Sequence, residues 1–181
     1  MSKDKQKAGE QPKEVGEEAL IEIRRGKAAE LRGEGKNPFA NDVSGEARSF
    51  VKALREEYAA ALTDSAELRY DAAKVDELAA GKPEVTVLGR LMARRGFGKV
   101  AFMELRDGSG TIQIFAKQDV LGDEFPVLSQ IDIADHLEVI GRVMVTKTGE
   151  LSVEAQHLRV LTKALRPLPD KWHGLSDVDL R

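Results

Sequence analysis

The chain has 181 residues, with 28 Lys and Arg against 31 Asp and Glu, a formal net charge of −3 and no cysteine. The nearly balanced charge excludes a globally basic nucleic-acid-binding protein, so a polyanion could bind only at a local patch. The absence of cysteine excludes disulfides and thiolate metal sites and fits a reducing cytoplasm. No apolar run is typical of a signal peptide or a membrane span, so we expect a soluble, cytoplasmic protein with no membrane partner.

The N-terminal part is predicted to be a polar tail followed by a helix. Residues 1–13 have almost nothing to bury, so we expect them to be disordered. A helix is predicted from about residue 14 to residue 32, ended by Gly33 and Gly35. Its apolar face would consist of Leu20, Ile23, Ala28 and Leu31, and its solvated face would carry Arg24, Arg25 and Lys27.

Two further helices are predicted before residue 84. Ser44 is a candidate N-cap for the first of them, whose apolar positions run from Phe50 to Leu62. A short third helix is predicted over residues 65–80. The helical region, residues 14–83, carries no recognisable chemistry, and we interpret it as a support.

From Glu84 onward the apolar period changes to two, which is typical of strands. Alternation predicts five strands, over residues 85–93, 100–107, 111–117, 136–146 and 150–161, with Val85, Val87, Gly89, Leu91 and Ala93 pointing inward on the first. Residues 119–131 break the alternation and are expected to form a short helix or a wrapped loop. Five strands with such an insert between the third and fourth predict an OB-fold β-barrel over residues 84–162, and an α+β fold for the whole chain.

The hairpin between the second and third predicted strands presents a candidate binding face. If Gly108 and Ser109 form a two-residue turn, Glu104 faces Gln113 and Phe102 faces Phe115, while the apolar side chains point the other way. Aromatic rings beside cations suit unpaired nucleobases, since every base has a π-face and every nucleotide a phosphate. The alternative is that other elements of the fold cover these two rings.

The loops that flank this face are cationic and contain glycine. They are Arg94–Lys99 and Lys147–Gly149. OB-folds bind oligonucleotides between the corresponding loops. They also bind proteins and sugars, so the fold alone does not decide the function.

The sequence contains no recognisable catalytic or metal-binding motif. His136, His157 and His173 are far apart, and none has the spacing of a metal ligand pair. Phosphate-binding, dinucleotide-binding and nucleophile motifs are lacking. We therefore expect a binding module with no cofactor of its own.

The last part of the chain, residues 163–181, is punctuated by proline and predicts an extended linker. We expect Leu165, Leu168 and Trp172 to pin it. Because no domain follows this linker in the sequence, we expect a second domain that the sequence does not include.

Several motifs of the sequence are specific when taken together, namely Met92–Arg95, Gly98-Lys99, Phe102, Asp107, Ile112-Gln113, Thr146–Ser152 and the long block Leu161–Leu175. Together they resemble the N-terminal part of bacterial class II lysyl-tRNA synthetase. Ala134 departs from the family, where a glycine is expected before the acidic residue, and we expect only a local effect on a turn. The resemblance implies an anticodon-binding OB-fold joined to a catalytic domain that uses ATP and Mg²⁺ to charge lysine tRNA.

The resemblance also implies roles for individual residues. Phe102 would stack on a base of a uridine-rich anticodon, Arg95 would bind from the first turn, Gln113 would read the central uridine, and Glu150 would contact the anticodon from the last turn. Arg94, Lys99, Phe115 and Lys147 would support these RNA contacts. The alternative for Glu150 is a turn carboxylate beside Lys147.

The resemblance implies lysine tRNA as the partner, with a possible homodimer and no DNA. The catalytic motifs of the family would lie beyond Arg181, so we expect this polypeptide alone to form no lysyl-tRNA. Two alternatives stay open: a general single-strand-binding OB module, and a scaffold that docks a synthetase.

Overall fold

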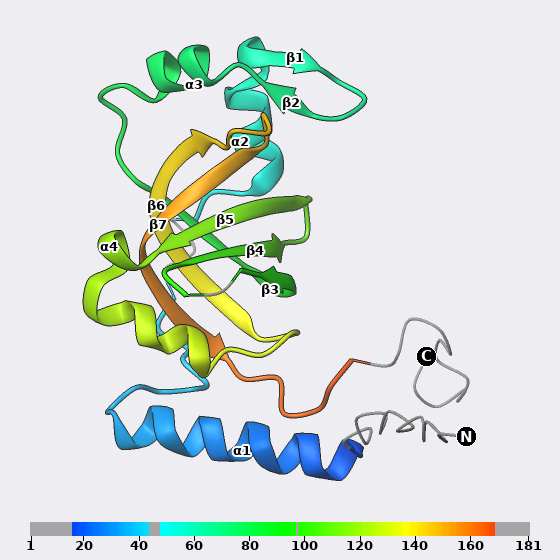
Figure 1. Cartoon of the computed structure of the whole chain (residues 1–181), viewed down its shortest axis with the longest axis vertical. Coiled ribbons are helices and arrows are strands. Elements are labelled where there is room, and N and C mark those ends of the chain that lie inside the picture. The colour runs from blue at the N-terminus through cyan, green and yellow to red at the C-terminus, as the bar shows by residue number, and fades with distance from the viewer. Residues whose placement is uncertain (1–15, 44–47, 97, 169–181) are drawn as a thin grey trace, which may run out of the picture.

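Five strands of the chain close into a barrel in the computed structural model, which describes residues 16–43, 48–96 and 98–168 (Figure 1). The strands are β3 (Val85–Arg95), β4 (Val100–Arg106), β5 (Thr111–Lys117), β6 (His136–Val145) and β7 (Leu151–Thr162). Their order around the barrel is β3-β4-β5-β7-β6, and β6 pairs back onto β3. Only β5 and β7 pair in parallel among these neighbours. The predicted OB-fold barrel and α+β class are confirmed.

The β4–β5 hairpin has the register that the two-residue turn predicts. Phe102 lies opposite Phe115, and Glu104 lies opposite Gln113. The alternate side chains of both strands are buried in the barrel, namely Ala101, Met103, Leu105, Ile112, Ile114 and Ala116. Because one face of the hairpin is core, the register is fixed and the opposite face is presented outward.

Strand β3 departs from simple alternation near its end. A bulge between Leu91 and Ala93 shifts its register against β4, and Ala93, predicted to point inward, is exposed. A bulge adds one residue to one strand and redirects the side chains that follow. Arg95 consequently lies directly opposite Phe102.

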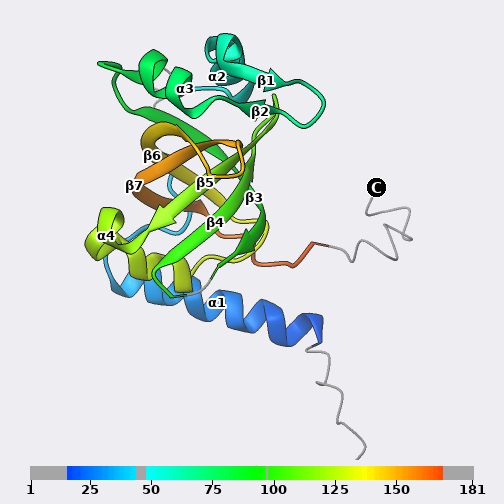
Figure 2. The ribbon, with the colours of Figure 1, turned by 45° about the horizontal axis from the view of Figure 1, so that its top comes forward.

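The remaining elements lie at the ends and side of the barrel (Figure 1 and Figure 2). Helix α1 lies below the barrel in both views, and the group α2, β1, β2 and α3 lies at the other end. These elements are α1 (Glu17–Gly33), α2 (Val51–Glu57), the 3₁₀ helix η1 (Ala59–Ala61), β1 (Leu62–Asp64), β2 (Arg69–Tyr70), α3 (Ala72–Ala79), α4 (Gln118–Leu121) and the 3₁₀ helix η2 (Gly122–Ser129). The predicted helix or wrapped loop after β5 is therefore α4 with η2.

The predicted third helix over residues 65–80 is wrong in its first half, where the chain forms the β1–β2 hairpin. Asp64 Oδ1 accepts hydrogen bonds from the backbone N–H groups of Ala66 and Glu67, at 2.8 and 3.1 Å. Such local bonds stabilise a turn in competition with a helix. Helix α3 begins only after Asp71, whose carboxylate caps it by accepting the N–H of Lys74.

Helix α2 is capped by the β4–β5 turn rather than by a residue of its own. Phe50 is its N-cap and makes no side-chain cap bond. Asp107 Oδ2 accepts the N–H of Val51, and Ser109 Oγ accepts the N–H of Lys52, both at 3.0 Å. The predicted N-cap, Ser44, lies outside the described residues. This tertiary cap fixes α2 against the hairpin that carries Phe102.

The faces of α1 differ from the prediction. Ile23, expected to be apolar core, is exposed, and Arg24, expected to be solvated, is buried. Arg24 Nη1 donates to the backbone oxygens of Ala164 and Arg166, at 2.7 and 3.1 Å. The segment after β7 is thus held by α1, while Leu168, one of its predicted anchors, is exposed.

Ala134, the position where the family resemblance implies glycine, has a positive φ of 81° and is buried. Its N–H donates to the oxygen of Leu91 at 2.8 Å. A left-handed backbone strains a residue with a Cβ atom, which explains why glycine suits this turn.

Some predictions concern residues that the structure does not describe. They are the disordered tail over residues 1–13, the cap at Ser44 and the anchor at Trp172. None of the described helices has both the length and the apolar character that crossing a bilayer requires.

Candidate nucleic-acid interface

A cleft of about 430 Å³ lies on the outward face of the β4–β5 hairpin, between the end of β3 and helix α2. Five of the eight predicted site residues line it, namely Arg94, Arg95, Phe102, Gln113 and Glu150. Arg55, Glu104 and Thr111 also contribute to its walls. The structure therefore brings together residues that span from α2 to the loop before β7.

Two half-buried aromatic rings form one side of the interface. The centroids of Phe102 and Phe115 are 4.9 Å apart, and their planes are tilted by 30°. The guanidinium carbon of Arg95 lies 5.8 Å from the centroid of Phe102, within the range of a cation–π contact. Phe102 lines the open cleft instead of being covered by other elements, so its ring can accept a flat ligand.

A hydrogen-bonded chain of polar side chains forms the other side. Gln113 Nε2 donates to Glu150 Oε2 at 2.8 Å, and the hydroxyl of Ser152 donates to Gln113 Oε1 at 3.2 Å. Gln113 is only 7% exposed, and Ser152 is fully buried. Since the Glu150 carboxylate can only accept hydrogen bonds, it sets which end of the Gln113 amide faces it, and Oε1 is left to accept from Ser152. One N–H of Gln113 and one oxygen of Glu150 are not used in this chain of bonds.

Glu150 belongs to the cleft and not to the turn alone. Its carboxylate is bonded to Gln113, and it forms no ion pair with Lys147 in the described structure. The Glu150 side chain therefore bonds to Gln113, while its backbone remains bonded to Thr146 in the turn.

Arg55 is a residue of the cleft that the sequence did not indicate. Its Nη2 donates to the oxygen of Thr111 at 2.8 Å, and its Nη1 lies 3.5 Å from the hydroxyl of Tyr70. The bond to Thr111 depends on α2 lying against the β4–β5 hairpin, and the contact with Tyr70 depends on β2; no local pattern around Arg55 reveals either. Ser152 was missed for a similar reason, because strand alternation does not identify a buried hydroxyl as a partner of Gln113.

The other predicted contacts are divided around the cleft. The guanidinium of Arg94 donates to the oxygen of Leu128 in η2, which commits part of it to the fold. Lys99 and Lys147 are exposed in the two flanking turns and do not line the cleft. Phe115 reaches the cleft only through its contact with Phe102.

Comparison with known proteins agrees with the fold of the barrel. Residues 85–161 match the tRNA anticodon family described as the OB-fold nucleic acid binding domain. The lysine–tRNA ligase of Latilactobacillus sakei is 41% identical over 160 residues, which are 88% of this chain and 29% of that protein. The lysine–tRNA ligase of Xanthomonas oryzae pv. oryzae is 45% identical over 165 residues, 91% of this chain and 30% of its own length.

The chain belongs to the lysine–tRNA ligase family. It spans about three tenths of the length of these curated relatives. The resemblance inferred from the motifs is confirmed, and the cleft lies on the anticodon-binding OB domain of a lysine–tRNA ligase.

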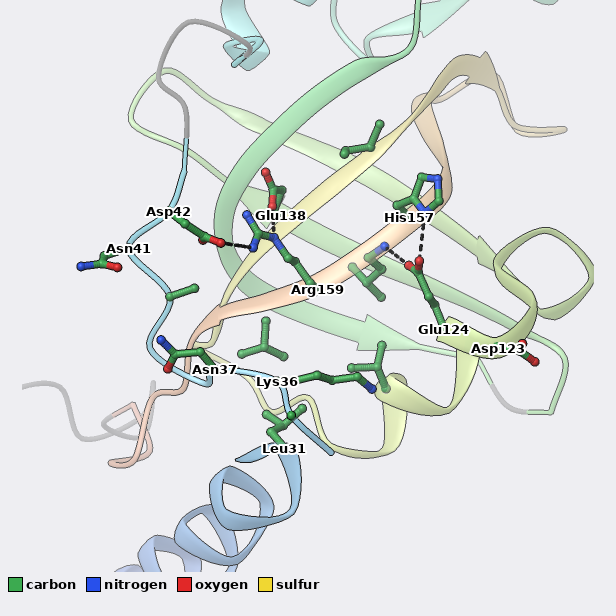
Figure 3. A pocket seen from close by; sticks show the side chains of 16 residues that line it. Leu31, Lys36, Asn37, Asn41, Asp42, Asp123, Glu124, Glu138, His157 and Arg159 are labelled. Carbon is green, nitrogen blue, oxygen red and sulfur yellow. Dashed lines mark hydrogen bonds and ion pairs between the residues drawn. The ribbon is translucent and has the colours of Figure 1, made fainter. Parts of the chain in front are cut away.

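A second, larger hollow of about 610 Å³ lies between the end of α1, η2 and strands β6 and β7 (Figure 3). Five of its seven ionisable side chains are paired with one another, and Lys36 and Asp123 are the other two. Arg159 binds Asp42 and Glu138, and His157 binds Glu124, as the dashed lines in Figure 3 show. Because four carboxylates line this hollow and its arginine is already paired with two of them, it is a poorer candidate for a nucleic acid than the cleft around Phe102. Within the part of the chain that the structure describes, no group of three His, Cys, Asp or Glu side chains could hold a metal ion.

The His157–Glu124 pair of this ligase-family domain should be visible in a pH titration. The hydrogen bond and charge of Glu124 raise the pKa of His157 above 6.5. Burial would raise the pKa of Glu124, but its bonds with His157 and with the N–H of Leu158 lower it. Stabilisation by protonated His157 is fully present below the ordinary histidine pKa and is lost as the pH rises through the raised value. We expect NMR titration to give a pKa above 6.5 for His157, and Glu124→Gln to lower it.

The matched control is His136, whose pKa is lowered by burial and then by Arg90. It should keep its titration curve in Glu124→Gln. An unchanged pKa of His157 in that variant would contradict the pairing. The effect on stability should be small, since the His157 side chain is 62% exposed.

Proposed function

We propose that the cleft binds the uridine-rich anticodon of lysine tRNA, with the central uridine stacked on Phe102. The observation that carries this proposal is the Gln113–Glu150 pair, held by Ser152 beside an accessible ring. The OB-fold match and the lysine–tRNA ligase relatives support nucleic acid as the ligand.

The free polar atoms of the cleft complement uracil. Uracil presents an N3–H donor between two carbonyl oxygens. The unused oxygen of Glu150 can accept the N3–H, and the remaining N–H of Gln113 or the guanidinium of Arg95 can donate to a carbonyl. Cytosine has an acceptor at N3, which would face the Glu150 carboxylate and repel it. The site therefore favours uridine over cytidine.

A substitution in the RNA tests this selectivity. We expect an anticodon stem–loop with cytidine in place of the central uridine to bind the chain more weakly by about 1–3 kcal/mol, roughly 5- to 150-fold. Fluorescence anisotropy at fixed salt measures the two dissociation constants. A stem–loop changed at a position outside the anticodon serves as the control and should bind as the original does.

Equal affinity for both RNAs would contradict anticodon reading and favour a general single-strand-binding module. No measurable RNA binding would favour a scaffold that docks a synthetase through protein contacts. The accessible ring of Phe102 and its cationic surroundings favour RNA over that second alternative.

The same proposal extends to the role of the longer family enzyme. Anticodon recognition by this part would serve ATP- and Mg²⁺-dependent formation of lysyl-tRNA in the cytoplasm, and the chain would pair in a homodimer. Lys99, Phe115 and Lys147 would provide supporting contacts to the anticodon loop from the rim of the cleft.

A further inference from the structure

Three side chains that can carry positive charge lie in one row across neighbouring strands of the barrel. Arg90 on β3 lies directly opposite Arg106 on β4 and directly opposite His136 on β6. Like charges directly opposite each other destabilise a sheet. An anion bound between them would remove this repulsion.

The row borders a hollow of about 420 Å³ that also contains Arg48. The Nε of Arg48 is buried and has no hydrogen-bond partner among the described residues. Within the same described ranges, the only carboxylate that lines the hollow is that of Asp107, which is 2% exposed and already accepts N–H groups of the turn and of α2. Arg48 Nη2 reaches it only at 4.0 Å.

The two arginines of the row lack the partners that other arginines of the fold have. Arg69 and Arg159 are paired with carboxylates. Neither Arg90 nor Arg106 forms an ion pair within the described part of the chain. The net charge of the whole protein is negative, so an unpaired cationic cluster is a local feature.

The pKa of His136 also reflects the positive charge of this cluster. Burial and then the charge of Arg90 lower its pKa, against an opposing effect of Asp135. His136 is therefore neutral near pH 7 and can donate or accept a hydrogen bond there. The negative charge of Asp135 is already bound by Lys163.

The hollow lies on the same outward face as the anticodon cleft. Arg106 follows Phe102 by four residues on β4, so the two side chains point the same way about 13 Å apart. Thr111 links the two sites, since Arg55 binds its backbone oxygen and Arg106 Nε binds its hydroxyl at 3.3 Å. Glu104 lies between them on β4, so the two cationic positions are separate sites.

We propose that Arg48, Arg90 and Arg106 bind a phosphodiester group of the RNA strand whose base stacks on Phe102. This site rests on the proposed function, because it lies on the path of a strand that leaves the cleft along β4. A guanidinium presents paired N–H donors that match two phosphate oxygens, and it stays charged at all relevant pH values. The contact is independent of sequence, and it fixes the register of the anticodon loop on the protein.

The test uses Arg90→Gln, Arg106→Gln and the double variant of the full chain, with the anticodon stem–loop as the probe. We expect the double variant to bind about 10-fold or more weakly at low salt. The slope of log Kd against log salt should fall by about 0.7 for each phosphate that the variant no longer binds. Arg142→Gln is the matched control, because it removes an exposed positive charge from β6 outside the hollow and should leave the slope unchanged.

A second measurement separates binding from folding. Removing one of two facing like charges should leave the melting temperature of the free protein unchanged or raise it. A fall in melting temperature together with weaker RNA binding would overturn the proposal in favour of a structural role.

Parallel measurements on Phe102→Ala distinguish this site from the cleft. If Phe102→Ala weakens binding and the double arginine variant retains both affinity and salt slope, the phosphate site is wrong while the proposed function stands. If neither variant affects binding, both are wrong. Inorganic phosphate that shifts the NMR signals of His136, with RNA affinity independent of Arg90 and Arg106, would assign the hollow to a free anion and overturn the RNA contact.

Discussion

Replacing Phe102 with alanine should weaken binding of the anticodon stem–loop by about 1–3 kcal/mol, roughly 5- to 150-fold in Kd. The ring lines the cleft beside Arg95, together with the Gln113–Glu150 pair. Alanine removes the face on which a base can stack and leaves the polar groups without a base held in their plane. Fluorescence anisotropy on the full chain measures the loss, and circular dichroism checks that the variant is folded.

Two further variants provide controls for this result. Phe39→Ala removes an exposed ring that lies outside the cleft, and it should not change the affinity. Phe102→Trp keeps an aromatic face and should retain most of the binding. A folded Phe102→Ala protein with the original affinity would show that RNA binds elsewhere, and the scaffold interpretation would gain weight.

The part of this interface that lies on one hairpin could be predicted from the sequence. Alternation and a two-residue turn are local properties, and they determine that Phe102 faces Phe115 and Glu104 faces Gln113. The barrel followed from the number and spacing of such strands. The bulge in β3 did not, because the alternation of Leu91 and Ala93 looks regular in the sequence.

The parts that depend on contacts between distant segments could not be predicted. Arg55 reaches the cleft only because Asp107 and Ser109 cap α2, a contact across more than 50 residues of chain. The periodicity of α1 by itself places Arg24 in solvent, whereas its guanidinium donates to the oxygens of Ala164 and Arg166 from the far end of the chain. Where a distant segment of the chain packs against a helix, the spacing of charged side chains therefore does not identify the solvent-exposed face of that helix.

The largest effect on stability is expected at another such long-range contact, that of Lys163. Its ammonium group is fully buried and donates to Gln130 O, Asp132 Oδ2 and Asp135 Oδ2, at 2.7, 2.7 and 2.6 Å. The Asp135 carboxylate is also fully buried, and it accepts the N–H of Ala164 as well. This cluster joins the end of β7 to the turn before β6, so the barrel and the segment after it depend on one cation.

We expect Lys163→Met to lower the free energy of unfolding by about 3–5 kcal/mol at pH 7, because it leaves the buried Asp135 carboxylate without its counterion and removes one of the two cations bound to Asp132. Burial alone would raise the pKa of Asp132, but its bonds from Lys163 and Lys27 lower it below the ordinary value. Stabilisation of this kind is present above the ordinary aspartate pKa and is lost as the pH falls through the lowered one. The difference between the two proteins in urea unfolding should therefore shrink in acid, as the carboxylates of the cluster take up protons.

Lys27→Met is the matched control for the buried cluster. Lys27 donates to the other oxygen of Asp132 at 2.5 Å, but its side chain is 24% exposed and Lys163 remains in place. Its loss should cost no more than about 1 kcal/mol. If the two variants unfold at the same urea concentration, the cluster contributes as an ordinary surface pair would. A loss at Lys163 that persists undiminished at low pH would point instead to the packing of the methionine side chain, because only an electrostatic cost disappears when the carboxylates take up protons.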